Sequence, residues 1–258
     1  MRRSRVVIGV AVAAVLAAGI VVAALPEMLL PDAASGADDA LTALKDARTV
    51  TVTATATSDD APFFGASVRR TTTGEDRVVG DFRHLAMTAT YPYVQVREVG
   101  PTVYAKNYSE SGTTPWVRLD TTGGDDLSLA MAAVDPTALL RFAGTNAENA
   151  LASRDGMFGM KYSVFCADCT DPLLGAADDG TTGTTGDDTA ADPGLQYEIH
   201  LDFVVDLRGR PTSITLRVTA GNTVDRRMTL RLSDFGAPLT VREPAGATPS
   251  PAPGAMTP

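Results

Sequence analysis

The side chains with the clearest capacity for chemistry are two cysteines, Cys166 and Cys169, in the motif CADC. A CxxC pair acts as a redox centre where it opens a helix, because the helix N-terminus stabilises the thiolate. Here the motif follows the strand-like segment KYSVF and runs into an acidic, glycine-rich stretch, whose charge opposes a thiolate. Two cysteines alone also cannot complete a tetrahedral metal site. We therefore expect a local structural disulfide, with a redox role and unpaired thiols as the alternatives.

The other candidates for chemistry are the two histidines, His84 and His200. Each stands alone, without cysteine or glutamate ligands at the short spacings that zinc sites use. The sequence has no HExxH, GxSxG or SxxK motif, and no GxGxxG between a strand and a helix. Carboxylates are abundant, but no pair stands out from a solvated background. We therefore expect no catalytic residue, no metal and no cofactor, and we do not predict an enzyme.

The charge balance limits the possible partners. The 258 residues include 22 basic and 31 acidic side chains, for a net charge of -9. Nucleic-acid binding needs clustered Lys and Arg that displace counterions, so this balance argues against nucleic acid. The acidic excess lies after residue 32, which also argues against an anionic membrane surface as a docking partner for that part. A monomer is expected.

The N-terminus carries a membrane signal. Arg2, Arg3 and Arg5 precede residues 6–25, an uncharged apolar run that is long enough to span a bilayer as a helix. Secretory signals usually have shorter apolar cores, but the small residues Val22, Ala23 and Ala24 would also suit cleavage. An uncleaved single-pass anchor in the cell membrane is favoured, with a cleaved secretory signal as the alternative. Both place the rest of the chain outside the cytoplasm.

Two low-complexity stretches divide the remaining chain. Residues 175–194 read GAADDGTTGTTGDDTAADPG, without the lysine of a P-loop or the spacing of an EF-hand. Residues 244–258 are rich in proline and poor in large apolar side chains. The predicted organisation is a signal anchor and linker at 1–36, one domain at 37–243 with a flexible acidic insertion at 170–194, and a disordered tail at 244–258.

The domain between these stretches has the period-2 pattern of β-strands. In residues 49–57 Val and Ala alternate with Thr, and in residues 195–207 seven apolar side chains fall on one face. Two further alternating runs, around 214–219 and 228–233, would complete an antiparallel meander. Weaker alternation predicts strands near 66–72, 77–89, 93–99, 102–108, 115–119 and 160–165.

Two segments are predicted to be short helices. Residues 37–47 place Leu41 and Leu44 on one side, with Asp38 and Asp39 in the first turn. Residues 135–142 begin with Asp as N-cap and Pro at the first helical position, and Gly144 is expected to end them. The fold class is therefore mainly β (α+β), with short helices covering the apolar face of an antiparallel sheet.

Several short motifs occur in an order that resembles the actinobacterial LppX/LprG-type lipoproteins. These are VVGDFRHLAMTAT, GPTVYAKNY, TTPWVRLD, DPTALLRFAG and LSDFGAPLTVREP. The resemblance implies a LolA-like fold, in which a curved sheet forms an incomplete barrel with helices over its concave face. It also implies a lipid or lipoglycan-like amphiphile held between sheet and helices. The lipidated cysteine of that family is missing here, and the insertion after Cys166 departs from its pattern.

The candidate ligand cavity combines this implied fold with the alternating apolar residues. Small side chains on the inner face would leave a hollow, which is the usual form of a small-molecule site. The same residues would instead form a packed core in a ligand-free interaction or sensor domain of the cell envelope, and that alternative stays open. The candidate residues are Val52, Ala54, Ala56, Leu85, Met87, Leu139, Leu140, Phe142, Tyr197, Ile199, Leu201 and Phe203.

Overall fold

The computed structural model describes residues 32–58, 61–83, 93–109, 112–113, 115–119, 131–156, 159–167, 197–220 and 224–249. All of them belong to one compact unit, Asp32–Pro258, which is separate from Met1–Pro31. The apolar run at 6–25, Leu85, Met87, His84 and the acidic insertion therefore lie outside the described residues. Within the described part, no helix combines the length and apolar character needed to cross a membrane.

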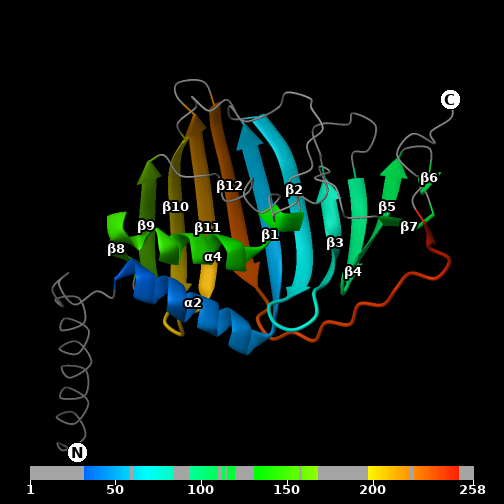
Figure 1. Ribbon diagram of the computed structural model, residues 1–258, viewed down its shortest axis with the longest axis horizontal. Helices are drawn as coiled ribbons and strands as arrows, with labels where there is room; N and C mark the ends of the chain where they lie inside the picture. Colours follow the sequence, from blue (N-terminus) through cyan, green and yellow to red (C-terminus); the bar gives the residue numbers. More distant parts are fainter. Residues whose placement is uncertain are drawn as a thin grey trace, which may run out of the picture. The chain divides into compact units, whose positions relative to one another are not determined.

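The fold is mainly β, as predicted, and the strands of the described residues form one 13-stranded sheet. Its order is β13-β7-β5-β4-β3-β2-β1-β12-β11-β10-β9-β8, with β6 paired to β5. The outermost strands β8 and β13 do not pair with each other, so the sheet stays open (Figure 1). The strands are β1 (Thr49–Ser58), β2 (Ala61–Thr71), β3 (Arg77–Arg83), β4 (Tyr93–Val99), β5 (Thr102–Ser109), β6 (Gly112–Thr113), β7 (Val117–Leu119), β8 (Ala150–Asp155), β9 (Gly159–Ala167), β10 (Tyr197–Asp206), β11 (Pro211–Ala220), β12 (Val224–Ser233) and β13 (Thr248–Pro249).

The two halves of the open sheet join in the middle, where β1 pairs with β12 of the last hairpin. β1 pairs antiparallel with β12, and Ala54 lies opposite Leu230. The predicted meander is confirmed as β10–β11–β12, with antiparallel registers throughout. Strands β2 to β5 continue from the other side of β1 as consecutive antiparallel neighbours. The β1–β12 pairing joins residues about 180 positions apart, so local pattern alone does not predict it.

Helix α2 (Ala33–Ala47) begins four residues earlier than predicted. Asp32 is its N-cap, and Asp32 Oδ1 accepts a hydrogen bond of 2.8 Å from the Ser35 backbone N–H. Asp38 and Asp39 therefore lie in the second turn and not in the first. The helix ends at Arg48, whose φ of 65° directs the chain into β1 while its N–H bonds to the Leu44 carbonyl.

Helix α4 (Pro136–Thr145) starts as predicted, with the Asp135 side chain accepting a hydrogen bond from the Thr137 N–H. It continues through Gly144, which was expected to stop it. The helix ends at Asn146, whose backbone N–H and Nδ2 both bond to the Phe142 carbonyl. A short 3₁₀ turn, η2 (Ala147–Asn149), then leads into β8, a strand that the sequence pattern did not predict.

The chain after β12 packs along the ends of the strands. Its composition predicted disorder from residue 244, and the structure differs from that prediction in part. Gly236 N–H bonds to the Thr49 carbonyl, and Arg69 and Arg97 donate to the carbonyls of Pro238 and Arg242. Residues 248–249 form β13, which pairs in parallel with β7. The predicted disordered tail from residue 244 is therefore wrong for residues 244–249, because backbone pairing with β7 does not require large apolar side chains.

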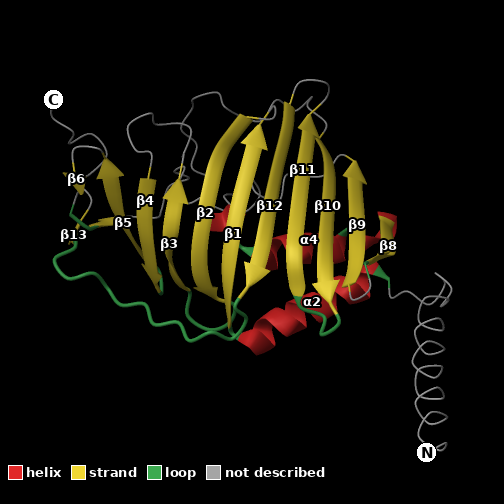
Figure 2. Cartoon of the chain, turned by 180° about the vertical axis from the view of Figure 1, so that it is seen from behind, coloured by secondary structure: helices red, strands yellow, loops and turns green. Residues whose placement is uncertain are grey.

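The two faces of the sheet differ completely. We call the face that carries Ala54 and Leu230 the inner face, and the face that carries Thr53, Thr55 and Arg231 the outer face. Helix α2 contacts β1, β8, β9 and β11 and also packs on α4. Both helices lie behind the strands from β8 to β1 when the sheet is viewed from its outer side (Figure 2). The core lies between these helices and the inner face.

Candidate functional site

The inner face is a continuous apolar surface. One row of register partners crosses it from β4 to β8 without a polar side chain. The row has two adjacent alanines on β2 and β1 and four consecutive large side chains from β12 to β9, and all its members but Ala152 are buried. In order, they are Val94, Phe82, Ala66, Ala54, Leu230, Ile214, Phe203, Tyr162 and Ala152.

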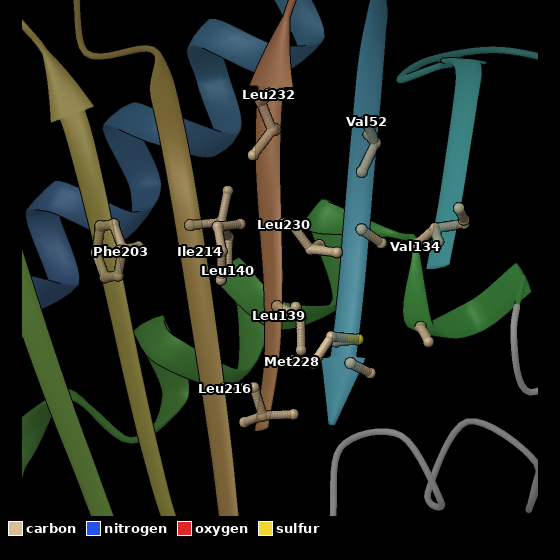
Figure 3. Close-up of a cluster of buried hydrophobic side chains, with 14 of the residues drawn as sticks. Val52, Val134, Leu139, Leu140, Phe203, Ile214, Leu216, Met228, Leu230 and Leu232 are labelled. Carbon is tan, nitrogen blue, oxygen red and sulfur yellow. The ribbon is translucent and has the colours of Figure 1, made fainter. Parts of the chain in front are cut away.

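The structure brings most of the predicted cavity residues into one hydrophobic cluster. Leu139 and Leu140 of α4 lie against the strands that carry Ile214 and Leu230 (Figure 3). Phe142 is partly buried and packs against the same cluster. Tyr197 begins β10, but its side chain is outside the described part, as are Leu85 and Met87. The remaining candidates in the cluster are Val52, Ala54, Ala56, Ile199, Leu201 and Phe203.

Under α2 this cluster is closely packed. A Cβ built on Gly36 would lie 2.4 Å from Tyr162 Cζ, so the helix backbone rests directly on that ring. The Tyr162 ring is stacked on Phe203, with centroids 4.8 Å apart. No layer for a ligand exists between Gly36 of α2 and the Tyr162 ring. Phe203, a candidate cavity residue, is therefore part of the packed core at this position.

The inner face continues over β2 to β5, beyond the strands that α2 chiefly contacts. Phe64 and Phe82 meet there with ring centroids 6.0 Å apart. Glycine is required at position 80 of β3, opposite Val68 of β2, because a Cβ would lie 2.3 Å from the Ser67 carbonyl oxygen. The apolar side chains of this part are mostly small or β-branched. Besides the two phenylalanines, they are Ala66, Val68, Val78, Val94, Val96, Val103 and Ala105.

A polar cluster interrupts the apolar inner face near the start of α4. Arg70 Nη2 lies 3.2 Å from Asp135 Oδ2, and the Arg70 side chain is only 11% exposed. The same carboxylate caps α4 through Thr137, which fixes its position. Glu98 shares the register row of Arg70, with Val78 between them. The cluster therefore places a guanidinium donor, Arg70, and two carboxyl acceptors, Asp135 and Glu98, at one edge of an apolar surface.

The electrostatics of this cluster centre on Glu98. The pKa of Glu98 is raised from 4.5 to about 7, chiefly by burial; the nearby carboxylates of Asp76 and Asp135 contribute to this rise, and Arg70 opposes it. Sequence reasoning missed this cluster. The available signal was a charged residue at an inward position of an alternating strand, Arg70 in SVRRT and Glu98 in VQVREV.

The cysteines and histidines first considered for chemistry do not form a catalytic or metal site in the described residues. Cys166, near the end of β9, is disulfide-bonded, and Cys169 lies outside the described residues. His200 is exposed on the outer face of β10, where its ring lies 4.6 Å from that of Phe165. The described residues contain no group of three or more His, Cys, Asp or Glu side chains placed to hold a metal ion.

Comparisons with known proteins add no assignment. No family model matches the sequence, and no curated protein matches it.

Proposed function

We propose that this domain is an extracytoplasmic, membrane-anchored binding protein that holds a lipid or other amphiphile between the inner face and the helices. In this proposal the open sheet is an incomplete barrel of the LolA-like type, with α2 and α4 over its concave face. The observation that carries it is the apolar inner face, which extends past the strands that α2 chiefly contacts and meets a partly buried polar cluster. A surface of that composition matches a molecule with an apolar body and a polar head.

The close contact between α2 and Tyr162 restricts where such a molecule would lie. The acyl part is assigned to the inner face of β1 to β5, next to Ala54 and Ala56, and not to the region under α2. Shielding each CH₂ from water there would contribute about 0.8 kcal/mol. The polar head would lie at Arg70, Asp135 and Glu98, which offer both donors and acceptors.

The first test is whether the protein carries a ligand from its own host. Native mass spectrometry and organic extraction of the full chain, purified from that host, should reveal a bound amphiphile in stoichiometric amount. Ala54→Phe fills the inner face, and Thr55→Phe, its matched control, adds the same ring to the exposed side of the same strand. The expected result is loss of the ligand in Ala54→Phe alone, with a folded protein in both.

The alternative is a ligand-free interaction domain with a filled core, and one observation favours it: Val52, Leu140, Ile199 and Leu201 are fully buried. In that case the wild type is reproducibly empty. Ala54→Phe then overpacks the core and destabilises the fold by about 1–3 kcal/mol. An empty wild type together with a destabilised Ala54→Phe would contradict the amphiphile proposal and support the ligand-free domain. N-terminal sequencing of the mature protein separates an anchor that keeps residues 6–25 from a secreted form that has lost them.

A further inference from the structure

Glu98 has a half-buried carboxyl group at the edge of the apolar inner face. It is the last inward-facing residue of β4, and its register partners, Val78 of β3 and Val103 of β5, are both buried and apolar. Within the part of the chain that the structure describes, the Glu98 carboxyl makes no hydrogen bond and no ion pair. An ionised carboxylate is unfavourable at such a position, whereas a protonated carboxyl is tolerated.

The described charged groups that act on Glu98 come from three neighbouring segments. Arg70 lies two strands away on β2 in the same register row, so the two Cα atoms are about 10 Å apart. Asp135 stands at the start of α4. Asp76 directly precedes β3, where its carbonyl accepts a hydrogen bond of 2.9 Å from the Gly100 N–H. Of these groups, Arg70 is the cation that could neutralise an ionised Glu98.

In the structure Arg70 is already engaged by Asp135. Arg70 Nη2 lies 3.2 Å from Asp135 Oδ2, and the two side chains are only 11% and 25% exposed. Asp135 Oδ1 also accepts a hydrogen bond of 2.9 Å from the Thr137 N–H, so one carboxylate both caps α4 and ties the start of the helix to β2. This ion pair therefore holds the start of α4 on the inner face.

We propose that Glu98 controls a latch between the start of α4 and the sheet. While Glu98 is protonated, Arg70 stays with Asp135 and the start of α4 stays on β2. When Glu98 gives its proton to water, its carboxylate draws Arg70 away from Asp135, and the start of α4 is released from the sheet. The latch would regulate access to the layer between sheet and helices, and this part of the inference rests on the proposed function.

The latch should open as the pH rises. With the latch closed, the pKa of Glu98 is raised from 4.5 to about 7, chiefly by burial. The released carboxyl is in water and regains a lower pKa, so the closed state loses stability as the pH rises through this interval. A complete return to the ordinary pKa would change the opening equilibrium by about 70-fold between pH 5 and pH 8. Because the carboxyl is only partly buried, screening reduces the expected change to about tenfold.

Amide hydrogen exchange of the full chain in detergent micelles measures the latch. Peptides that cover α4 and the central strands β1 and β12 are compared by mass spectrometry at pH 5 and pH 8, after correction for the intrinsic pH dependence of exchange. In the wild type, protection of α4 should fall about tenfold at pH 8. This loss should not depend on low concentrations of urea, because local release exposes little surface, whereas exchange of β1 and β12 through global unfolding does.

Three variants assign the pH response to the latch. Glu98→Gln keeps a neutral side chain of the same shape, so protection of α4 should be the same at both pH values. Asp135→Asn removes the charge but retains a good N-cap, so protection should be low at both pH values. Glu148→Gln, the matched control, makes the same change at an exposed position beyond the other end of α4 and should keep the wild-type response.

Three results would overturn the inference. The first is equal protection of α4 at both pH values in the wild type, and the second is a pH response that persists in Glu98→Gln. The third is a loss of protection at pH 8 that depends on urea as strongly in α4 as in β1 and β12, because this would be global unfolding. None of these measurements needs a bound amphiphile, so failure of the latch is distinguishable from failure of the proposed function.

Discussion

Gly36→Ala tests whether α2 rests directly on the sheet. Gly36 is in the first turns of α2, where its N–H bonds to the Asp32 carbonyl. Helix propensity alone favours alanine by about 1 kcal/mol. The new Cβ, however, would lie 2.4, 2.7 and 2.8 Å from three ring atoms of Tyr162. That ring cannot retreat, because it is buried and stacked on Phe203.

Helix propensity and overpacking have opposite effects on the free energy of unfolding of Gly36→Ala, and the overpacking is expected to be larger. Overpacking a filled core costs about 1–3 kcal/mol, and a contact this short belongs at the upper end of that range. After the propensity gain, Gly36→Ala should destabilise the domain by about 1–2 kcal/mol. Gly144→Ala in α4 is the matched control, because its Cβ would lie at an ordinary 3.7 Å from Ala37 Cβ. This control should gain about 0.5–1 kcal/mol.

Urea unfolding followed by circular dichroism measures the free energy of unfolding of both variants. Thermal unfolding is a second measurement: in a domain of this size a change of 1 kcal/mol shifts the thermal midpoint by about 2–4 °C, so the two variants should be clearly separated. Combining Gly36→Ala with Tyr162→Leu should reduce its cost, since the double-mutant cycle removes the contact itself. If Gly36→Ala stabilises the protein as Gly144→Ala does, α2 is not seated on Tyr162. The region under α2 would then be open to a ligand.

The remaining predictions concern two polar groups. Because the pKa of Glu98 is raised from 4.5 to about 7, the folded state retains a proton that the unfolded state has released, and stability falls as the pH rises through this interval. Glu98→Gln should therefore stabilise the protein by on the order of 1 kcal/mol at pH 8 and have little effect at pH 4, as measured by urea unfolding. Equal effects at both pH values would contradict burial of the Glu98 carboxylate. Thr51 Oγ1 is buried without a hydrogen-bond partner in the described part, so Thr51→Val should raise the free energy of unfolding by about 1 kcal/mol; a loss of stability would show that the hydroxyl is bonded.

Local pattern predicted the strands well where one face is buried and the other is wet. The alternation of Val and Ala with Thr in β1 correctly predicted which side chains face inward. In β10 the prediction is confirmed for Ile199, Leu201, Phe203 and Val205, whereas Leu207, which was expected on the same face, lies beyond the strand and is 75% exposed. β8 escaped prediction because ALASRD contains only one large apolar residue, Leu151, and that side chain is 75% exposed. β8 is a strand because its backbone pairs with β9.

The features that matter most for the proposals depend on contacts between distant residues. Ala33 to Gly36 read as a linker, and the helix that they form is explained by the Asp32 cap and by the space that Gly36 leaves for Tyr162. Similarly, Arg70 and Asp135 are 65 positions apart, and only the packing of α4 on the inner face joins them. Composition counts Glu98 among the acidic side chains but could not show that it shares a register row with Arg70.

The matched pair Ala54→Phe and Thr55→Phe separates the two interpretations of the inner face. In β1, Ala54 points inward while Thr53 and Thr55 point outward, because side chains alternate along a strand. If the inner face holds an amphiphile, Ala54→Phe should remove it and Thr55→Phe should retain it. If the core is filled, the wild type and both variants should be empty, and Ala54→Phe should lower the free energy of unfolding because it overpacks the core.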